Sequence, residues 1–153
     1  MVLFKNRYMV IEVFVNSKDS SGNDPIIITE GNVSGAIKES IEKNFGECGL
    51  AISLGSFQVK YVNSTTKLLI VRVSRDDHQK VWCAITMVRN IQNCPITFNL
   101  LDLSGSIRAC RNAALKCDEA KFEQYKIEAG GNVPPEKSAT VKRCFEKIKL
   151  LES

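Results

Sequence analysis

Residues 8–15, Tyr-Met-Val-Ile-Glu-Val-Phe-Val, are apolar at every position except Glu12. Apolar β-branched and aromatic side chains on both faces predict a strand in the centre of a sheet that is covered on both sides. Residues 68–73, Leu-Leu-Ile-Val-Arg-Val, show the same pattern and predict a second central strand. Residues 57–61, Phe-Gln-Val-Lys-Tyr, alternate between apolar and polar. This alternation indicates a half-buried strand that forms a hairpin with residues 68–73.

Two amphipathic helices are predicted around this hairpin. In the first, Asn32 is the expected N-cap and Gly46 the expected stop. Apolar residues recur every four positions between them, at Val33, Ile37, Ile41 and Phe45. The second helix follows Ser74 and Asp77, whose spacing predicts a capping box. Its expected buried stripe consists of Val81, Trp82, Ile85 and Val88.

A fourth strand is predicted at residues 96–100, and a third helix from about residue 104 to Lys126. The order is therefore β-α-β-β-α-β with added C-terminal helices, an α+β, ferredoxin-like antiparallel sheet of the kind also found in RNA recognition modules. In this fold the first and third strands are central, and these are the two strands that are apolar on both faces. We expect a ferredoxin-like domain at residues 1–126, a linker at 127–137 and a C-terminal helix at 138–153.

The size and composition exclude several classes of protein. The chain has 153 residues and 44% hydrophobic residues, which suits one domain with an ordinary core and excludes a large multidomain enzyme. No apolar run approaches the roughly 20 residues of a membrane span, so we expect no membrane partner. The six cysteines form no CxxC pair, and His78 is the single histidine. We therefore expect reduced, intracellular core thiols, no metal site and no cofactor.

The net charge of +4 is unevenly distributed. Residues 16–50 carry 3 Lys or Arg against 6 Asp or Glu, whereas residues 57–93 carry 6 against 2. Residues 107–126, which include most of the third predicted helix, carry 5 against 3. Positive charge in the middle of the chain and in one later helix suits an acidic or phosphate-bearing partner, although an ordinary solvated surface has the same composition.

The residues do not predict a catalytic site. Metal-free RNA cleavage needs a paired acid and base, commonly two histidines, whereas His78 is single and lies at a predicted helix start. Metal-dependent cleavage needs several convergent carboxylates, and the predicted strands supply only Glu12 and, after the last strand, Asp102. An acylphosphatase of this topology would need an arginine in the loop after the first strand, and that loop carries acidic residues instead.

The start of the third helix is the strongest candidate for binding an anion. Gly105 allows a backbone to approach closely, and Ser104 or Ser106 can cap the helix, whose first N–H groups carry a partial positive charge. Because residues 68–73 include no aromatic residue, bases would not stack on the sheet, and RNA contact would be made through phosphates. The candidate RNA-binding residues are Lys5, Arg7, Gly105, Ser106, Arg108 and Arg111.

Several short segments occur in an order and spacing that resemble a known family. They are Phe4–Tyr8, Val59–Asn63, Arg72, Val81-Trp82, Phe98-Asn99 and Leu103–Cys110. Together they are similar to the fifth "processing of precursor RNAs" protein subunit of eukaryotic ribonuclease P and ribonuclease MRP. The resemblance covers about Met1 to Lys126.

The resemblance implies a non-catalytic protein subunit of ribonuclease P, ribonuclease MRP or both. The RNA subunit would carry catalysis with bound magnesium, in removal of the 5′ leader of precursor tRNA and in processing of precursor rRNA. The implied partners are this RNA, a barrel-shaped protein subunit and a small subunit of similar fold. Precursor tRNA or precursor rRNA would be an indirect partner. The implied location is the nucleus and nucleolus.

Two other functions remain open from the residues. The first is a protein–protein adaptor, suggested by the stripe of small and apolar residues Ile107, Cys110, Ala114 and Cys117 on the third helix. The second is a small-ligand regulatory domain of the same topology, although the loop after the first strand is long for such a site. Arg72 interrupts a predicted central strand, and we expect it to have a buried partner there.

Overall fold

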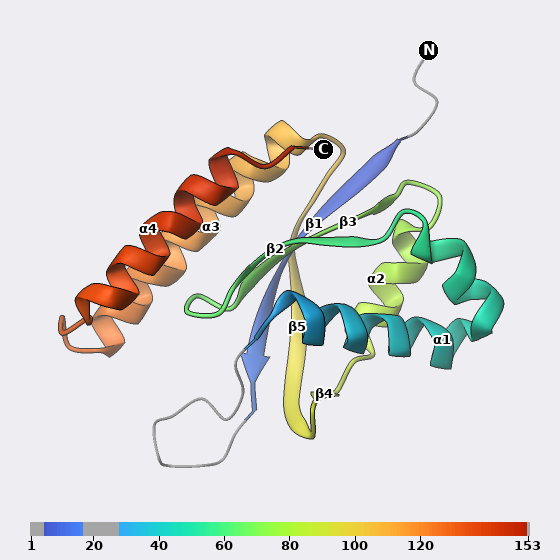
Figure 1. Ribbon diagram of the computed structural model, residues 1–153, viewed down its shortest axis with the longest axis horizontal. Helices are drawn as coiled ribbons and strands as arrows, with labels where there is room; N and C mark the ends of the chain where they lie inside the picture. The colour runs from blue at the N-terminus through green and yellow to red at the C-terminus, as the bar shows by residue number, and fades with distance from the viewer. Residues whose placement is uncertain (1–4, 17–27, 153) are drawn as a thin grey trace.

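The computed structural model describes residues 5–16 and 28–152. Within these residues five strands form one antiparallel sheet in the order β2-β3-β1-β5-β4 (Figure 1). The strands are β1 (Asn6–Val15), β2 (Gln58–Asn63), β3 (Leu68–Ser74), β4 (Asn90–Ile91) and β5 (Cys94–Ser104). The helices are α1 (Glu30–Leu54), α2 (His78–Thr86), α3 (Ile107–Glu128) and α4 (Pro135–Lys149).

The ferredoxin-like α+β fold is confirmed, including the placement of its strands. β1 and β3 pair with each other and have a strand on each side, as their two-sided apolar sequences predict. β5 takes the position of the fourth strand, and the short β4 adds to its outer edge. Neither β1 nor β3 is at an edge, so their backbone groups are paired on both sides.

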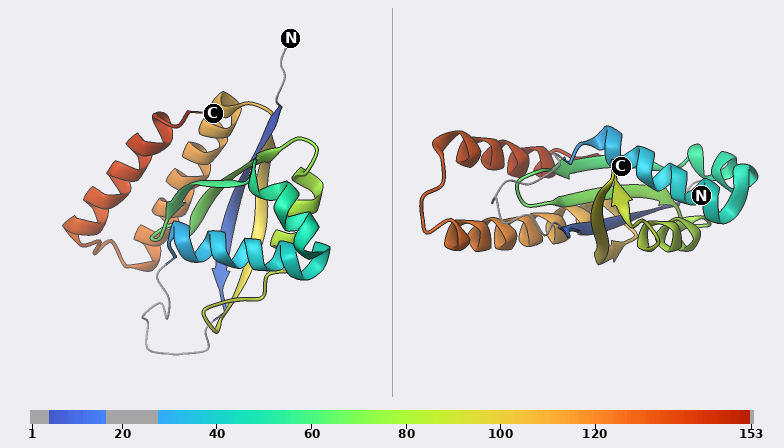
Figure 2. Two further views of the ribbon diagram at one scale, coloured as in Figure 1. Left: turned by 45° about the vertical axis from the view of Figure 1, so that its right-hand side comes forward. Right: turned by 90° about the horizontal axis from the view of Figure 1, so that it is seen from below.

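Both faces of the sheet are covered by helices. α1 and α2 lie on one side and α3 and α4 on the other (Figures 1 and 2). Along β1 the side chains alternate between two hydrophobic clusters, because successive residues of a strand point to opposite faces. Met9 and Ile11 pack in the cluster under α1 and α2, whereas Tyr8 and Val10 pack in the cluster under α3 and α4.

The first helix begins and ends differently from the prediction. Thr29, not Asn32, is the N-cap: its Oγ1 accepts a hydrogen bond from the Asn32 N–H at 3.2 Å. Asn32 instead accepts from the Thr29 N–H through Oδ1 at 2.9 Å, which completes a reciprocal capping box. Gly46 does interrupt the helix, since its φ of 76° is left-handed, but helical structure resumes and continues to Leu54.

Two further expectations need correction. Trp82 is 38% exposed rather than part of the buried stripe of α2. The cysteines are all free, but only Cys94 and Cys110 are buried, while Cys48 and Cys83 are exposed. Burial raises the pKa of the Cys110 thiol to about 12, so it stays protonated within the core.

The C-terminal helix begins earlier than predicted. α4 covers residues 135–149 rather than 138–153, and α3 continues to residue 128, so the connection between them is residues 129–134. Ile148 of α4 and Leu151, just beyond it, are buried in the cluster under α3 and α4. The last helix therefore contributes to the core.

One buried carboxylate joins α3 to the β2–β3 hairpin. The Asp118 side chain is fully buried and accepts hydrogen bonds from Tyr61 Oη at 2.6 Å, from Asn63 Nδ2 at 3.2 Å and from the Thr66 hydroxyl. Asn63 Oδ1 in turn accepts from the backbone N–H groups of Thr65 and Thr66. Burial and the charge of Asp118 raise the pKa of Tyr61 far above its usual value, so the phenol remains a donor.

Replacing this carboxylate should destabilise the fold strongly. We expect Asp118→Leu to lower the free energy of unfolding by about 3 kcal/mol, because three buried donors lose their acceptor. Tyr61→Phe removes one donor and should lower it by about 1 kcal/mol. Urea unfolding measures both changes, with the exposed neighbour variant Glu119→Leu as the control. Equal stability of Asp118→Leu and the control would show that the network does not hold α3 in place.

Candidate nucleic-acid interface

The six candidate residues lie at one end of the molecule. β1 begins there, β3 and β5 end there, and α3 starts there (Figure 1). Lys5 immediately precedes β1, Arg7 is its second residue, and Gly105 and Ser106 connect β5 to α3. The antiparallel sheet brings together segments that are about 100 positions apart in the sequence. It thereby creates a basic end, defined by Lys5, Arg7, Arg108 and Arg111.

Arg7 and Gly105 are direct neighbours. A Cβ atom built on Gly105 would lie 3.5 Å from Arg7 Nη1 and 3.8 Å from its Cζ, so the guanidinium lies beside the connection that leads into α3. Arg7 Nη1 also donates to the backbone oxygen of Asn6 at 3.0 Å, and the residue is half-buried. The space beside the Gly105 backbone is thus occupied by the Arg7 side chain of the same chain.

Ser106 caps α3. Its extended backbone and its hydroxyl oxygen, which accepts from the Ala109 N–H at 3.2 Å, are typical of an N-cap. Ser104 is buried and donates instead to Asp102 Oδ2 at 2.5 Å. Of the two serines that could cap the helix by sequence, Ser106 does so.

Arg108 and Arg111 differ in their availability. Arg108 is exposed, whereas Arg111 is half-buried and donates through Nη1 to the backbone oxygen of Lys149, 3.3 Å away at the end of α4. A cation at a helix C-terminus satisfies a terminal carbonyl and complements the helix dipole. Together with Lys149 the two arginines line a cleft of about 280 Å³ between α3 and α4. The Arg108 side chain is therefore available to a partner, whereas Arg111 also binds the C-terminal end of α4.

Sequence reasoning missed two basic residues at this end. Lys149 comes from α4, in the part of the chain that the resemblance does not cover. Arg75 follows β3, donates its backbone N–H to the Lys5 oxygen at 2.9 Å and lies 4.0 Å from Asp76. No sequence pattern linked these residues to Lys5 or Arg108, because only the packing of α4 and the end of β3 places them there.

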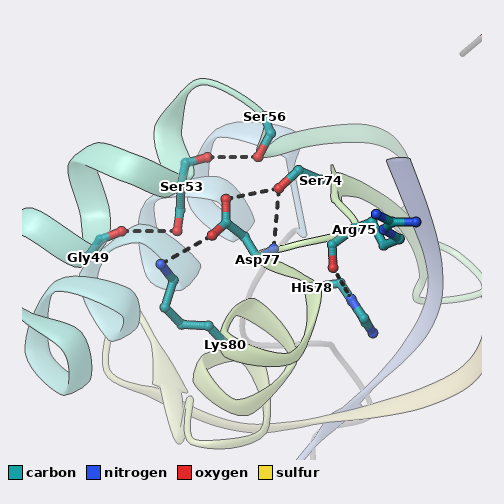
Figure 3. A network of polar contacts seen from close by, with 8 residues as sticks. All are labelled: Gly49, Ser53, Ser56, Ser74, Arg75, Asp77, His78 and Lys80. Atoms are coloured by element: carbon teal, nitrogen blue, oxygen red, sulfur yellow. Dashed lines mark hydrogen bonds and ion pairs between the residues drawn. The ribbon is translucent and has the colours of Figure 1, made fainter. Parts of the chain in front are cut away.

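The groups considered for catalysis have local partners. His78 Nδ1 lies 2.5 Å from the Arg75 oxygen at the start of α2, next to the pair in which Ser74 donates to Asp77 (Figure 3). Asp102 accepts from Ser104 and pairs with Val10 in the register of β1 and β5, two positions along β1 from Glu12. Within residues 5–16 and 28–152 no cluster of three His, Cys, Asp or Glu side chains could hold a metal ion. Across the same residues no helix is long and apolar enough to span a membrane.

Glu12 is the polar interruption of β1, and its partners explain it. Asn99 Nδ2 donates to Glu12 Oε1 at 2.8 Å, and the Lys121 ammonium of α3 forms an ion pair with Oε2. Burial alone would raise the pKa of Glu12, but the hydrogen bonds from Lys121 and Asn99 and the charge of Lys121 lower it below its usual value. Glu12 thus helps to fix α3 on the sheet.

The sheet face used for base stacking in RNA recognition modules is covered here. Tyr8 of β1 is 2% exposed beneath α3 and α4. The small-residue stripe of α3 is used for the same packing: Cys110 and Ala114 are fully buried, and Ile107 and Cys117 pack against them. This stripe is therefore used mainly in packing α3 on the sheet, and the covered sheet face is not open for base stacking.

Comparison with known proteins identifies the family. The sequence profile described as "Rpp14/Pop5 family" matches residues 7–115. A curated relative from Arabidopsis thaliana, "Probable ribonuclease P/MRP protein subunit POP5", is 58% identical over the whole of both chains. The chain belongs to the Rpp14/Pop5 family. Another relative of this chain in the Rpp14/Pop5 family, the Schizosaccharomyces pombe "Ribonuclease P/MRP protein subunit POP5", is 28% identical, with 83% of this chain and 95% of the relative covered.

A solved structure has the same fold as this Rpp14/Pop5 family member. One chain of "Cryo-EM structure of yeast Ribonuclease MRP" matches with a TM-score of 0.56 and 17% identity, covering 82% of this chain and 95% of that chain. The family match begins at residue 7 and ends at residue 115, so it contains β1 to β5 and the first turns of α3. Five of the six candidate residues lie inside it, and Lys5 lies just before it.

Loss of Lys121 should change how stability depends on pH. Because the pKa of Glu12 is lowered on folding, its contribution is present above the unfolded pKa and is lost as the pH falls through the folded value. We expect Lys121→Met to lower the free energy of unfolding by about 1 kcal/mol at pH 7. The deficit should shrink towards pH 4, where protonation removes the unpaired charge of Glu12.

Urea unfolding at pH 7, 5 and 4 measures this effect, with Lys116→Met on the exposed face of α3 as the control. A deficit that stays constant over this range would show that Glu12 and Lys121 do not interact as an ion pair.

Proposed function

We propose that this chain is a non-catalytic protein subunit of a ribonuclease P/MRP particle. The observation that carries the proposal is the 58% identity, over the full length of both chains, to an Arabidopsis protein named as a probable subunit of that particle. The fold shared with a chain of the yeast ribonuclease MRP structure is consistent with it. The particle acts in processing of precursor tRNA, precursor rRNA or both.

In this proposal the RNA of the particle carries catalysis and the protein supports it. The side chains considered for acid–base or metal chemistry support this division of roles, because Glu12, Asp102 and His78 are each engaged by another residue of the chain, namely Lys121, Ser104 and Arg75. The chain would meet precursor tRNA or rRNA only indirectly, through the RNA that it stabilises.

The basic end would contact RNA phosphates. We assign this contact to Lys5, Arg7, Gly105, Ser106, Arg108 and Arg111, which the fold brings to one place. Phosphate contacts position a protein on RNA without reading its sequence, and exposed arginines suit them. Such contacts need no aromatic platform, which agrees with the coverage of both sheet faces by helices.

Other surfaces fit protein neighbours. Trp82 on α2 is 38% exposed, and Leu101 and Leu103 on β5 are 36% and 38% exposed, although these residue types favour burial. We assign such surfaces to the other protein subunits that the resemblance implies, a barrel-shaped subunit and a small subunit of similar fold. Assembly with the particle would place the chain in the nucleus and nucleolus.

Purification from cells tests the proposal. The full chain, tagged and recovered under mild conditions, should enrich the RNA of ribonuclease P, of ribonuclease MRP or of both, identified by sequencing. An unrelated tagged protein of similar size and charge serves as the control. Recovery of protein neighbours with no enriched RNA would favour the adaptor function instead.

Arg108 should matter for RNA binding and not for folding. We expect Arg108→Ala to weaken binding of the particle RNA severalfold and to reduce the slope of log affinity against log salt by about one, because one phosphate contact is lost. The thermal midpoint should stay unchanged, since the side chain is exposed. Filter binding at 50 to 200 mM salt measures the slope, and Lys116→Ala is the matched control. An unchanged slope would remove Arg108 from the interface.

A further inference from the structure

Arg72 has a guanidinium with no partner in the part of the chain that the structure describes. It lies on β3, opposite Tyr8 of β1 and Gln58 of β2. Its Nε atom is buried, and no hydrogen bond or ion pair within residues 5–16 and 28–152 satisfies it. Among the described residues, the expected buried partner is therefore absent. A buried N–H donor without an acceptor is unfavourable, and here it belongs to a half-buried arginine.

The acidic side chains of the following turn do not supply an acceptor for Arg72 Nε. Asp76 lines the same pocket as Arg72, but its side chain is 90% exposed and lies 4.0 Å from the Nε of Arg75. Asp77, in the same turn, receives hydrogen bonds from Ser74 and Lys80 (Figure 3). Both carboxylates thus have other cationic or hydroxyl neighbours, and within the described residues neither satisfies the buried Nε of Arg72.

A pocket of about 290 Å³ adjoins Arg72. Its walls come from the start of β1, the residues after α1 and the end of β3, so three separate segments enclose it. Lys5, Asn6, Ser56 and Ser74 line it together with Arg72. The two serine hydroxyls already donate, to the Ser53 oxygen and to Asp77 (Figure 3). The ammonium, guanidinium and amide groups of Lys5, Arg72 and Asn6 around one small space are suited to a tetrahedral oxyanion.

We propose that this pocket binds a backbone phosphate of RNA and that Arg72 supplies the central charge. The inference rests on the proposed function and extends it to a site separate from the start of α3. Lys5 belongs both to this pocket and to the basic end, so one RNA strand can reach the two places in succession. Arg72 is preferred to a lysine here because a guanidinium can give two parallel hydrogen bonds to one phosphate.

The proposal predicts opposite effects on stability and on binding. The buried Nε donor of Arg72 has no acceptor among the described residues of the free protein and would gain one only in the complex. Arg72→Met should therefore leave the thermal midpoint unchanged or raise it, while it weakens binding of RNA. A purely structural arginine would behave differently, because its loss would lower both the midpoint and the affinity.

A second variant tests the same idea without removing Arg72. Asn6 lines the pocket and lies opposite Ser74 in the register of β1 and β3. Asn6→Asp would place a carboxylate at the pocket, where it can pair with Arg72 and repel a phosphate. We expect it to raise the thermal midpoint and to weaken RNA binding. Arg89→Met, at an exposed arginine outside the pocket, is the matched control.

The experiment uses the full chain and a transcript of the ribonuclease P or MRP RNA, with filter binding at 50 to 200 mM salt. For Arg72→Met we expect affinity to fall about five- to tenfold and the salt slope to fall by about one, as for one lost phosphate contact. Arg72→Lys should retain the slope and lose part of the affinity, because it keeps the charge but not the paired donors.

The outcomes separate the two proposals. If Arg108→Ala weakens binding while Arg72→Met and Asn6→Asp do not, the pocket is refuted and the proposed function stands. If Arg72→Met lowers the thermal midpoint as well as the affinity and Asn6→Asp changes neither, Arg72 is structural and the pocket is again refuted. If the unaltered chain neither binds the transcript nor recovers the RNA from cells, the proposed function fails.

Discussion

The position of α3 depends on the buried carboxylate of Asp118. Three donors from β2 and the turn after it converge on this group, and each would be left unsatisfied if the helix moved away. The second attachment, between Lys121 of α3 and Glu12 of β1, lies one turn further along the helix. Since α3 is fixed at both points, its first turn is held at the end of the sheet, where Ser106 and Arg108 lie.

Helices cover both faces of the sheet, so neither face is open for stacking RNA bases. An RNA recognition module leaves one sheet face open, but here α3 and α4 bury Tyr8 and the other residues of that face. Under the proposed function, RNA contact would therefore be made at the rim of the sheet, where strand ends and a helix start offer cations and N–H groups. The rim also holds two different kinds of arginine. Arg108 is exposed, whereas Arg72 is partly buried and unpaired.

Local sequence patterns succeeded where a few neighbouring residues decide the outcome. The two-sided apolar character of residues 8–15 and 68–73 predicted central strands, and β1 and β3 are central. Gly46 was predicted to end the first helix; its left-handed φ interrupts the helix there, but α1 continues to Leu54. The N-cap was wrongly predicted at Asn32, because Thr29 and Asn32 are both good capping residues. Only the reciprocal pair of hydrogen bonds shows that Thr29 is the N-cap and that Asn32 is the third residue of the helix.

By itself the sequence determined the order of strands and helices, the ferredoxin-like topology and the collection of basic residues in the middle of the chain. Hydrophobic periodicity and capping act over a few residues, so one chain without its fold is enough to detect them. Tertiary structure alone decided that Asp118 meets Tyr61, that Arg111 binds the end of α4 and that Arg72 Nε has no acceptor within residues 5–16 and 28–152. These contacts join groups that are far apart in the sequence. Whether a buried polar group finds a hydrogen-bond partner therefore depends on which distant segments the fold places beside it.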